Sequence, residues 1–276
     1  MDKLLDEIES YWSTRTEGYS EVNEKELKGM QKKAWLETLE RGFFGKRSGK
    51  NEDSENNSVE KEVFEEEFSE KQHTDKYKDH LRILDIGTGP GFFPMILAEA
   101  GYHVTAIDYT PGMLEKAAEN AAKFIGEKSR NIEFKRMDAQ ALEFEDESFD
   151  VIISRNLTWT LPHVSHAYGE WLRVLKKGGV LLNFDANYGI TDFSNVADLP
   201  ENHAHNILGD DMMRECEEIK RQLPISSYSR PAWDLETLGS MEVKDFRVDL
   251  GISSRIYLEK DEFYNPTPLF MLRTVK

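Results

Sequence analysis

A glycine-rich turn carries the strongest chemical signal, in "LRILDIGTGPGFFPMILAEAGYHVTAIDYT" (residues 81–110). Gly87, Gly89 and Gly91 follow a short apolar run and precede a helical pattern. Such glycines allow tight backbone angles and leave no side chain between the backbone and a ligand. Phe92 stands where a dinucleotide fingerprint needs glycine or alanine, and no Lys-Ser/Thr pair completes a P-loop. The turn therefore predicts a different ligand, or else only a tight strand-to-helix connection.

Three aspartates at predicted strand ends indicate what that ligand is. Asp85, two residues before the first glycine, would repel a pyrophosphate and attract an ammonium group. Asp108 lies about 20 residues past the turn, where an acid can accept hydrogen bonds from ribose hydroxyls. Asp108 could also cap a helix that starts at Pro111. Asp138 could accept a hydrogen bond from an exocyclic amine. An uncharged or positively charged nucleoside derivative suits this set best.

From residue 81 onward, short apolar runs alternate with helical segments, which predicts a parallel sheet covered on both faces. The sequence "KKGG" at 176–179 is predicted to end a helix. The segments "EVKDFRVDLG" and "TPLFMLRTVK" predict two final strands that form an antiparallel hairpin at one edge. The predicted strands before them are 82–86, 103–108, 132–137, 151–154 and 180–185, and the predicted helices are 92–100, 111–125 and 163–175.

The flanking regions predict separate units around this core. Helices are expected over 1–12 and about 21–42, before glycines break the pattern. Residues 46–80 are acidic and predict a solvated or disordered insertion, with an interaction segment as the alternative. The expected division is N-terminal helices at 1–45, the insertion at 46–80, the core at 81–186, a cap at 187–240 with a helix near 210–222, and C-terminal strands at 241–276.

Composition limits the classes of function. The chain has 276 residues, 39% of them hydrophobic, and a net charge of −17. This charge disfavours a nucleic-acid partner, although a local basic groove could exist. No apolar run reaches 18 residues, so no membrane span is expected. The single Cys216 excludes an internal disulfide framework. A cytoplasmic protein is expected, and its oligomeric state stays open.

Five segments together resemble a known family: "ILDIGTGPG", "VTAID", "MDAQAL", "FDVIISRNLTW" and "LRVLKKGGVLLNFD". In order and spacing they are similar to the class I S-adenosylmethionine-dependent methyltransferases, over residues 81–186. The resemblance implies a Rossmann-like, doubly wound, mostly parallel seven-stranded α/β sheet with an antiparallel C-terminal edge hairpin and a helical cap. "YWSTRTEGYS" and "RPAW" resemble a small-molecule branch similar to methyltransferase type 11.

The resemblance implies S-adenosyl-L-methionine as the cofactor. It places the glycine turn and Asn156 at the methionine part, Asp108 at the ribose, and Tyr109, Met113, Asp138 and Ala139 around the adenine. The N-terminal segment would close over the cofactor, although Tyr11 and Arg15, four residues apart on one helix face, could simply pack. The implied cofactor-binding residues are Tyr11, Arg15, Tyr19, Asp85, Gly87, Thr88, Gly89, Gly91, Asp108, Tyr109, Met113, Asp138, Ala139 and Asn156.

Catalytic and acceptor-binding residues are harder to assign. His163 and Tyr188 are the candidate general bases, although His163 could simply start a helix. His203 and His205 have a spacing that could bind metal, but no third ligand is evident, so no metal is expected. The candidate substrate-binding residues are Trp159, Arg230 and Trp233. Core packing is the alternative for the tryptophans, and a surface ion pair for Arg230.

The predicted function is transfer of a methyl group from S-adenosylmethionine to a small molecule by in-line displacement. "RNLTW" replaces an Asn-Pro-Pro-Tyr type of motif, which disfavours amino methylation of DNA bases. The alternatives are a non-catalytic S-adenosylmethionine-binding regulator and a methyltransferase of a basic protein or peptide. Phe92 disfavours a nicotinamide-dependent oxidoreductase. The acceptor atom and the need for a general base stay open.

Overall fold

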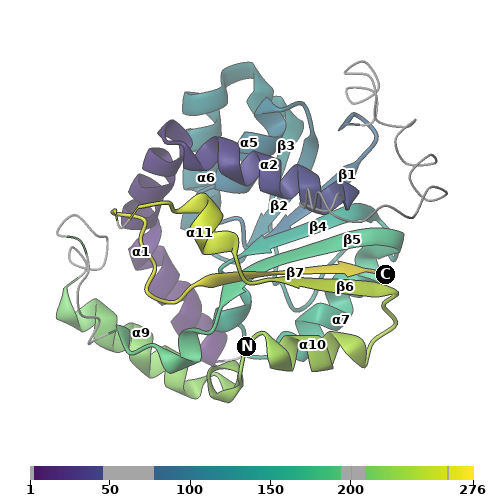
Figure 1. The fold of residues 1–276 in the computed structure, drawn as a ribbon. Coiled ribbons are helices and arrows are strands. Elements are labelled where there is room, and N and C mark those ends of the chain that lie inside the picture. The colour runs from purple at the N-terminus through teal and green to yellow at the C-terminus, as the bar shows by residue number, and fades with distance from the viewer. Residues whose placement is uncertain (1–2, 46–77, 194–199, 201–208, 260) are drawn as a thin grey trace, which may run out of the picture.

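The structure is a computed structural model, and it describes residues 3–45, 78–193, 200, 209–259 and 261–276. The chain forms one seven-stranded sheet with helices on both faces, α2, α5 and α6 on one side and α7 and α10 on the other (Figure 1). Most of the predicted acidic insertion lies outside the described residues, and so do His203 and His205.

The strand order β3-β2-β1-β4-β5-β7-β6 confirms the predicted fold class. Strands β1 to β5 pair in parallel, and β7 pairs antiparallel to both β5 and β6. The order reverses between β1 and β4, the position at which doubly wound sheets bind ligands beyond their carboxyl ends. The strands are β1 (Arg82–Ile86), β2 (His103–Asp108), β3 (Ile132–Arg136), β4 (Phe149–Arg155), β5 (Leu175–Ala186), β6 (Asp245–Asp249) and β7 (Leu269–Val275).

The helices bury the apolar sides of the sheet. Trp35 of α2 is fully buried, and its ring meets Phe93 of α5 and Phe184 of β5 at 5.1 Å each, which fixes α2 against the core. The helices are α1 (Lys3–Lys28), α2 (Gln31–Phe44), α5 (Phe92–Glu99), α6 (Pro111–Ile125), α7 (Val164–Val174), α9 (Asp210–Gln222), α10 (Ala232–Gly239) and α11 (Ile252–Ile256). The predicted bounds of α6 are confirmed.

The N-terminal prediction of two helices, 1–12 and 21–42, is wrong in its boundaries. Helix α1 continues through the polar segment between them, because Tyr11, Thr16 and Ser20 are buried and this packing outweighs weak local helix propensity. The break lies at Gly29 and Met30 instead. Helix α2 ends before Gly45, which has a left-handed φ of 73°.

The helix before "KKGG" ends within one residue of its predicted end, but "KKGG" itself forms part of a strand, which the prediction placed only from residue 180. Helix α7 ends at Val174, and residues 176–179 belong to β5. The backbone N–H of Gly178 donates to the Lys276 carbonyl at 2.8 Å, and the Lys276 N–H donates to the Gly179 carbonyl at 3.2 Å. Pairing with the end of the chain, far away in sequence, therefore begins β5 earlier than the predicted residue 180.

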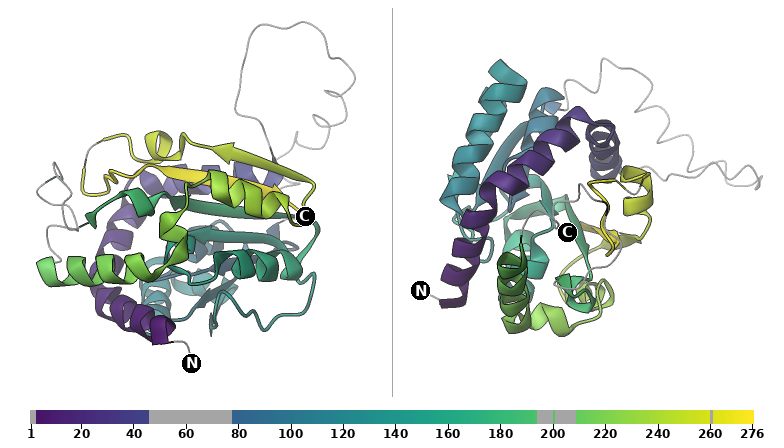
Figure 2. Two further views of the ribbon diagram at one scale, coloured as in Figure 1. Left: turned by 90° about the horizontal axis from the view of Figure 1, so that it is seen from below. Right: turned by 90° about the vertical axis from the view of Figure 1, so that its left-hand side faces the viewer.

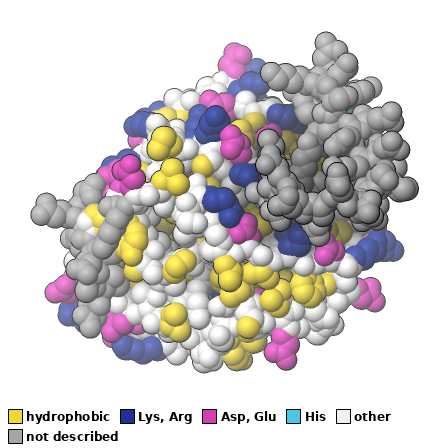
Figure 3. Space-filling model, viewed as in Figure 1, with side chains coloured by type: hydrophobic (Ala, Val, Ile, Leu, Met, Phe, Trp, Pro, Cys, Tyr) yellow, Lys and Arg dark blue, Asp and Glu magenta, His cyan; other side chains and the backbone are white. Residues whose placement is uncertain are grey.

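The surface of the described part mixes both charges. Figure 3 shows basic and acidic side chains interspersed on one face of the molecule. The edge strand β6 is exposed along most of its length, with Phe246 and Val248 among its exposed apolar residues. Over the described residues, no helix has the length and apolar character needed to cross a bilayer.

Candidate functional site

The glycine turn has the backbone geometry that its sequence predicts. Gly87, Gly89 and Gly91 have φ angles of 70°, 53° and 91°, all in the left-handed region. A Cβ at Gly87 would lie 2.8 Å from the Leu157 side chain, and one at Gly91 would lie 3.0 Å from the Ala117 Cβ. A side chain is therefore disfavoured by backbone strain at all three positions, and at Gly87 and Gly91 by crowding as well.

A cavity of about 750 Å³, including its open mouth, lies at the carboxyl ends of β1, β2 and β4. We call it the first cavity. Helix α1 covers it from the side of the sheet where those strands end (Figures 1 and 2). The predicted cofactor-binding residues that line it are Tyr19, Gly87, Gly89, Asp108, Tyr109, Met113, Asp138, Ala139 and Asn156. Asp85, Thr88 and Gly91 belong to the same turn without lining the cavity.

Asp108 connects the ends of two strands. One carboxylate oxygen accepts the Gly89 N–H at 2.8 Å, and the other accepts the Thr110 N–H at 2.9 Å. Helix α6 has Thr110 as its N-cap, so Asp108 is not the cap residue itself. Burial raises the pKa of Asp108 above its usual value, and these backbone donors oppose the rise. Each carboxylate oxygen keeps a lone pair for a further donor.

Asp85 and Thr88 each have a buried side-chain oxygen without a hydrogen-bond partner among the described residues. Asp85 is 2% exposed, and burial raises its pKa to about 7, against the lowering effects of the Thr88 hydroxyl and Arg155. Neither Asp85 Oδ2 nor the Thr88 hydroxyl makes a hydrogen bond of normal geometry within the described chain. A buried acceptor left without a donor is costly, so a ligand donor here would be stabilising.

The third and fourth strand ends complete the first cavity. Asp138 Oδ1 accepts the Gln140 N–H at 2.8 Å, which holds the loop after β3 in place. Asn156, after β4, has a left-handed φ of 55°, unusual for a residue other than glycine. Its side-chain oxygen accepts the Tyr188 hydroxyl at 3.1 Å. Uncommon backbone geometry of this kind clusters at functional sites.

A buried ion pair holds α1 over the site. Arg155 at the end of β4 contacts Glu26 of α1 at 3.0 Å, with side chains 10% and 3% exposed. Glu26 also accepts the Tyr257 hydroxyl at 2.8 Å. On the other side of α1, the Asn120 amide donates to the Ser20 hydroxyl at 3.0 Å.

A second cavity of about 1080 Å³ adjoins the first, and Trp12, Tyr19, Arg155 and Asn156 line both. The predicted residues Tyr11 and Arg15 line this second cavity and not the first. They are in contact as expected, with Arg15 Nη1 donating to the Tyr11 hydroxyl at 2.7 Å. Trp159 and Tyr188 line it too, with ring centroids 5.0 Å apart.

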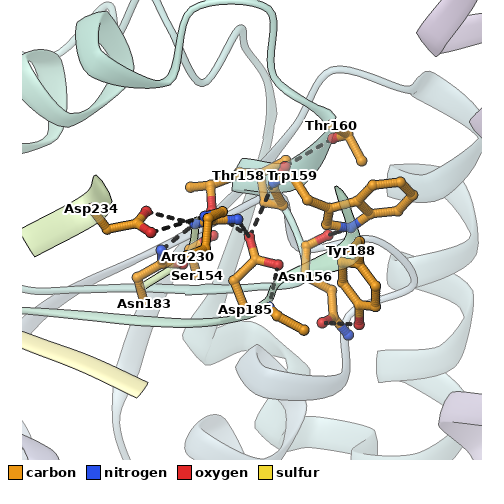
Figure 4. A network of polar contacts seen from close by, with 12 residues as sticks. Ser154, Asn156, Thr158, Trp159, Thr160, Asn183, Asp185, Tyr188, Arg230 and Asp234 are labelled. Atoms are coloured by element: carbon orange, nitrogen blue, oxygen red, sulfur yellow. Dashed lines mark hydrogen bonds and ion pairs between the residues drawn. The ribbon is translucent and has the colours of Figure 1, made fainter. Parts of the chain in front are cut away.

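The loop that carries Trp159 is fixed by a buried polar network (Figure 4). Asp185 of β5 accepts the Trp159 N–H at 3.1 Å and contacts the Arg230 guanidinium at 3.2 Å. Arg230 also bonds Asp234 at 2.7 Å, and Asp234 accepts the Tyr168 hydroxyl at 2.6 Å. Burial raises the pKa of Asp185, and Arg230 acts against that rise.

The structure does not bring Arg230, His163 or Trp233 to either cavity. Arg230 is 6% exposed with buried carboxylates as partners, so it is not a surface ion pair. His163 is exposed and is the N-cap residue of α7. Trp233 stacks on Tyr228, with centroids 4.9 Å apart, in a separate groove that His163 also lines.

Tyr188 lies at the second cavity, but its hydroxyl is in use. It donates to Asn156 and accepts the Asn265 amide at 2.8 Å. Burial raises its pKa well above the usual value for tyrosine, so the phenolate needed for a general base is strongly disfavoured. In the part of the chain that the structure describes, no group of three His, Cys, Asp or Glu residues could hold a metal ion.

Sequence reasoning missed the residues that join α1 to the core. Arg155 is a charged residue at the end of an apolar strand pattern, "FDVIISR", and that position could have marked it. Glu26 looks like one more acid on an acidic helix, and nothing local distinguishes it from Glu24. Asp185 lies near the end of its strand as the predicted acids do, yet its partners are Arg230 of the cap and the loop that carries Thr158 and Trp159.

Comparison with known proteins gives consistent matches. Residues 84–183 match the family model described as a methyltransferase domain. The demethylmenaquinone methyltransferase of Leptospira interrogans is 33% identical over 172 residues, 59% of this chain and 65% of that protein. The arsenite methyltransferase of Halobacterium salinarum is 38% identical over 100 residues, 35% of this chain and 25% of that protein. Thus the chain covers less than two thirds of the length of these relatives.

Among solved structures, phosphoethanolamine N-methyltransferase 2 of Haemonchus contortus, in complex with S-adenosyl-L-methionine, is 21% identical with a TM-score of 0.48. The match covers 71% of this chain and 48% of that one. Residues 84–183, which carry the glycine turn and the aspartates at the ends of β2 and β3, are therefore similar to the methyltransferase-domain family.

Proposed function

We propose that this protein transfers a methyl group from S-adenosyl-L-methionine to a small molecule. The observation that carries the proposal is the first cavity, where an open left-handed glycine turn after β1 meets the carboxylates of Asp108 and Asp138 at the ends of β2 and β3. The bound cofactor would supply a methyl carbon on a sulfonium: an acceptor lone pair bonds to that carbon, the carbon–sulfur electron pair stays on sulfur, and any acceptor proton leaves to solvent.

The residues present fit this cofactor. The free acceptor of Asp85 and the Thr88 hydroxyl suit its ammonium end, and the remaining lone pairs of Asp108 suit the ribose hydroxyls. Asp138 and Ala139 would meet the adenine edge, with Tyr109 and Met113 beside the ring. Asp108, Tyr109, Met113, Asp138 and Ala139 all line the first cavity, which supports their assignment as a set.

Helix α1 would exclude water from the reacting centre. Trp12 and Tyr19 line both cavities, so they lie where a cofactor and an acceptor would meet. Asn156, which accepts the Tyr188 hydroxyl, also lines both cavities. The chain would contribute alignment and a dry, shaped site, which suits an in-line displacement.

A small-molecule acceptor is supported by two observations. Relatives with 33–38% identity are named for demethylmenaquinone and arsenite, which are both small molecules. The net charge of −17 disfavours nucleic acid as the substrate. A cytoplasmic location is part of the proposal, and the single cysteine is in keeping with it.

Titration calorimetry tests the proposal directly. The full chain should bind S-adenosyl-L-methionine and its demethylated product, and NADH should give no heat. Asp108→Asn should weaken cofactor binding by about 1–3 kcal/mol, the scale of a charge-assisted hydrogen bond. Asp150→Asn is the matched control, because Asp150 also accepts a backbone N–H, from Arg82 at 2.9 Å, but lies at the opposite end of the sheet. No binding of either cofactor form would refute the proposal.

A further inference from the structure

Aromatic side chains from separate segments wall the second cavity. Trp12 of α1 meets Trp159 with ring centroids 6.1 Å apart, Trp159 meets Tyr188 at 5.0 Å, and Tyr188 meets Phe193 at 5.6 Å. Faces and edges of rings offer a planar molecule stacking and edge contacts. The shape and chemistry of this wall therefore favour an aromatic occupant.

The charges on the same wall are not all neutralised. Arg155 is paired with Glu26, and Glu262 is paired with Lys25 at 3.7 Å. Arg15 differs, because among the described residues no carboxylate lies within ion-pair distance of its guanidinium. Its position is instead over the rings of Tyr11 and Trp12, at 5.7 and 5.9 Å.

The groups that face Arg15 do not supply a negative charge. Burial raises the pKa values of the Tyr11 hydroxyl and the Cys216 thiol, so both stay neutral near pH 7. Arg15 Nη1 uses the Tyr11 oxygen, but its Nε is buried and has no hydrogen-bond partner. A buried guanidinium donor without an acceptor is unfavourable unless a ligand provides one.

We propose that the second cavity binds an aromatic acceptor carrying a carboxylate, with the ring among Trp12, Trp159 and Tyr188 and the carboxylate on Arg15. A guanidinium fork matches a carboxylate with two parallel hydrogen bonds. Aromatic walls by themselves would also attract a quaternary ammonium, but the unpaired charge of Arg15 repels a cation. The sign of the charge on Arg15 therefore selects the acceptor class.

The cavity is placed for this use. Tyr19 and Asn156 line both cavities, so a molecule anchored at Arg15 would lie next to the wall shared with the glycine turn. The role of aromatic carboxylates as methyl acceptors rests on the proposed methyl transfer. As ligands of the second cavity they can be tested by binding alone, without cofactor or turnover.

The experiment compares four probes on the full chain by calorimetry: 4-hydroxybenzoate, its neutral amide 4-hydroxybenzamide, the non-aromatic 4-hydroxycyclohexanecarboxylate, and phenyltrimethylammonium. 4-Hydroxybenzoate should bind at least about tenfold more tightly than each of the others, which corresponds to one charge-assisted contact or one stacking surface. Arg15→Gln should remove the preference for benzoate over the amide. Lys3→Gln, which removes the same charge from an exposed site on α1, should keep it.

Each outcome decides the proposal. Equal binding of benzoate and amide, tighter binding of the cation, no binding by any probe, or an unchanged preference in Arg15→Gln overturns it. The wild-type comparison remains decisive even if Arg15→Gln does not fold. Cofactor binding is measured in parallel. If the wild-type chain binds no cofactor, the proposed methyl transfer is refuted. If it binds the cofactor but shows no preference for 4-hydroxybenzoate, only the proposed acceptor class is refuted.

Discussion

The buried carboxyl of Asp85 should make cofactor binding depend on pH below neutrality. Its pKa is raised to about 7 by burial, and the proposed ammonium partner binds the ionised form. Each pH unit below 7 then costs about 1.36 kcal/mol, so the affinity at pH 5 should be about 100-fold lower than its limit at high pH. The ligand's own α-amino group, with a pKa of about 7.7–8.0, stays protonated from pH 5 to 7.

Titration calorimetry at pH 5, 6 and 7 and constant ionic strength measures this dependence. Asp85→Asn cannot ionise, so its affinity should be lower than that of the wild type at pH 7 and nearly constant over the range. A wild-type affinity that is flat between pH 5 and 7 would contradict the ammonium role of Asp85. A slope that persists in Asp85→Asn would assign the titration to another group.

The same shift has a consequence for stability without ligand. A carboxyl whose pKa rises from 3.8 in the unfolded chain to about 7 in the folded one binds more protons when folded. The contribution of Asp85 to the free energy of unfolding is therefore fully present below pH 3.8. It is lost as pH rises to 7, by an amount on the order of 4 kcal/mol. The measured quantity is the free energy of unfolding of Asp85→Asn minus that of the wild type, from urea denaturation. This difference should be more favourable to the variant at pH 8 than at pH 5. Equal differences at the two pH values would show that Asp85 titrates normally.

Three further predictions concern α1 and the catalytic candidates. Glu26→Gln leaves the buried Arg155 unpaired and should lower the free energy of unfolding by about 3–5 kcal/mol, measured by urea denaturation. Glu24→Gln, which breaks an exposed pair on the same helix, should cost only about 0–1 kcal/mol. Tyr188→Phe should reduce kcat by less than about tenfold, because a true general base contributes about 10²–10⁴-fold. His163→Ala should leave both cofactor binding and kcat near wild-type values, because His163 lies outside both cavities.

The controls for these predictions are contained in the same measurements. Equal losses in Glu26→Gln and Glu24→Gln would show that burial does not decide the strength of these pairs. A loss of a hundredfold or more in kcat for Tyr188→Phe, at unchanged cofactor affinity, would restore the general-base assignment. Loss of activity in His163→Ala at unchanged stability would place the acceptor in the groove beside α7.

Patterns within a few residues predicted much of this fold. The apolar runs of β1 and β2 and the helix α6 have the predicted bounds, because burial and helix propensity act on neighbouring residues. The turn glycines were identifiable for the same reason: the left-handed angles of Gly87 and Gly89 are a local requirement. Strand–helix alternation predicted a parallel sheet covered on both faces, and the doubly wound arrangement was implied by the family resemblance.

Local patterns failed where distant segments compete. The strand after α7 was predicted to start at residue 180, but backbone pairing with Lys276 extends β5 through residues 176–179. The polar middle of α1 suggested a break, but packing against the core keeps the helix continuous. Propensity is worth a few tenths of a kcal/mol per residue, and tertiary packing outweighs it.

The sequence by itself determined the sheet, the glycine turn and the aspartates that end the first three strands, because each depends on residue types at short spacing. Only the tertiary structure decided that Arg230 is neutralised by Asp185 and Asp234, and that Arg15 lies unpaired in the second cavity. The sequence alone does not show whether a charged side chain has a partner of opposite charge. Its role depends on which carboxylate the fold brings within about 4 Å, and residues far apart in the chain settle that distance.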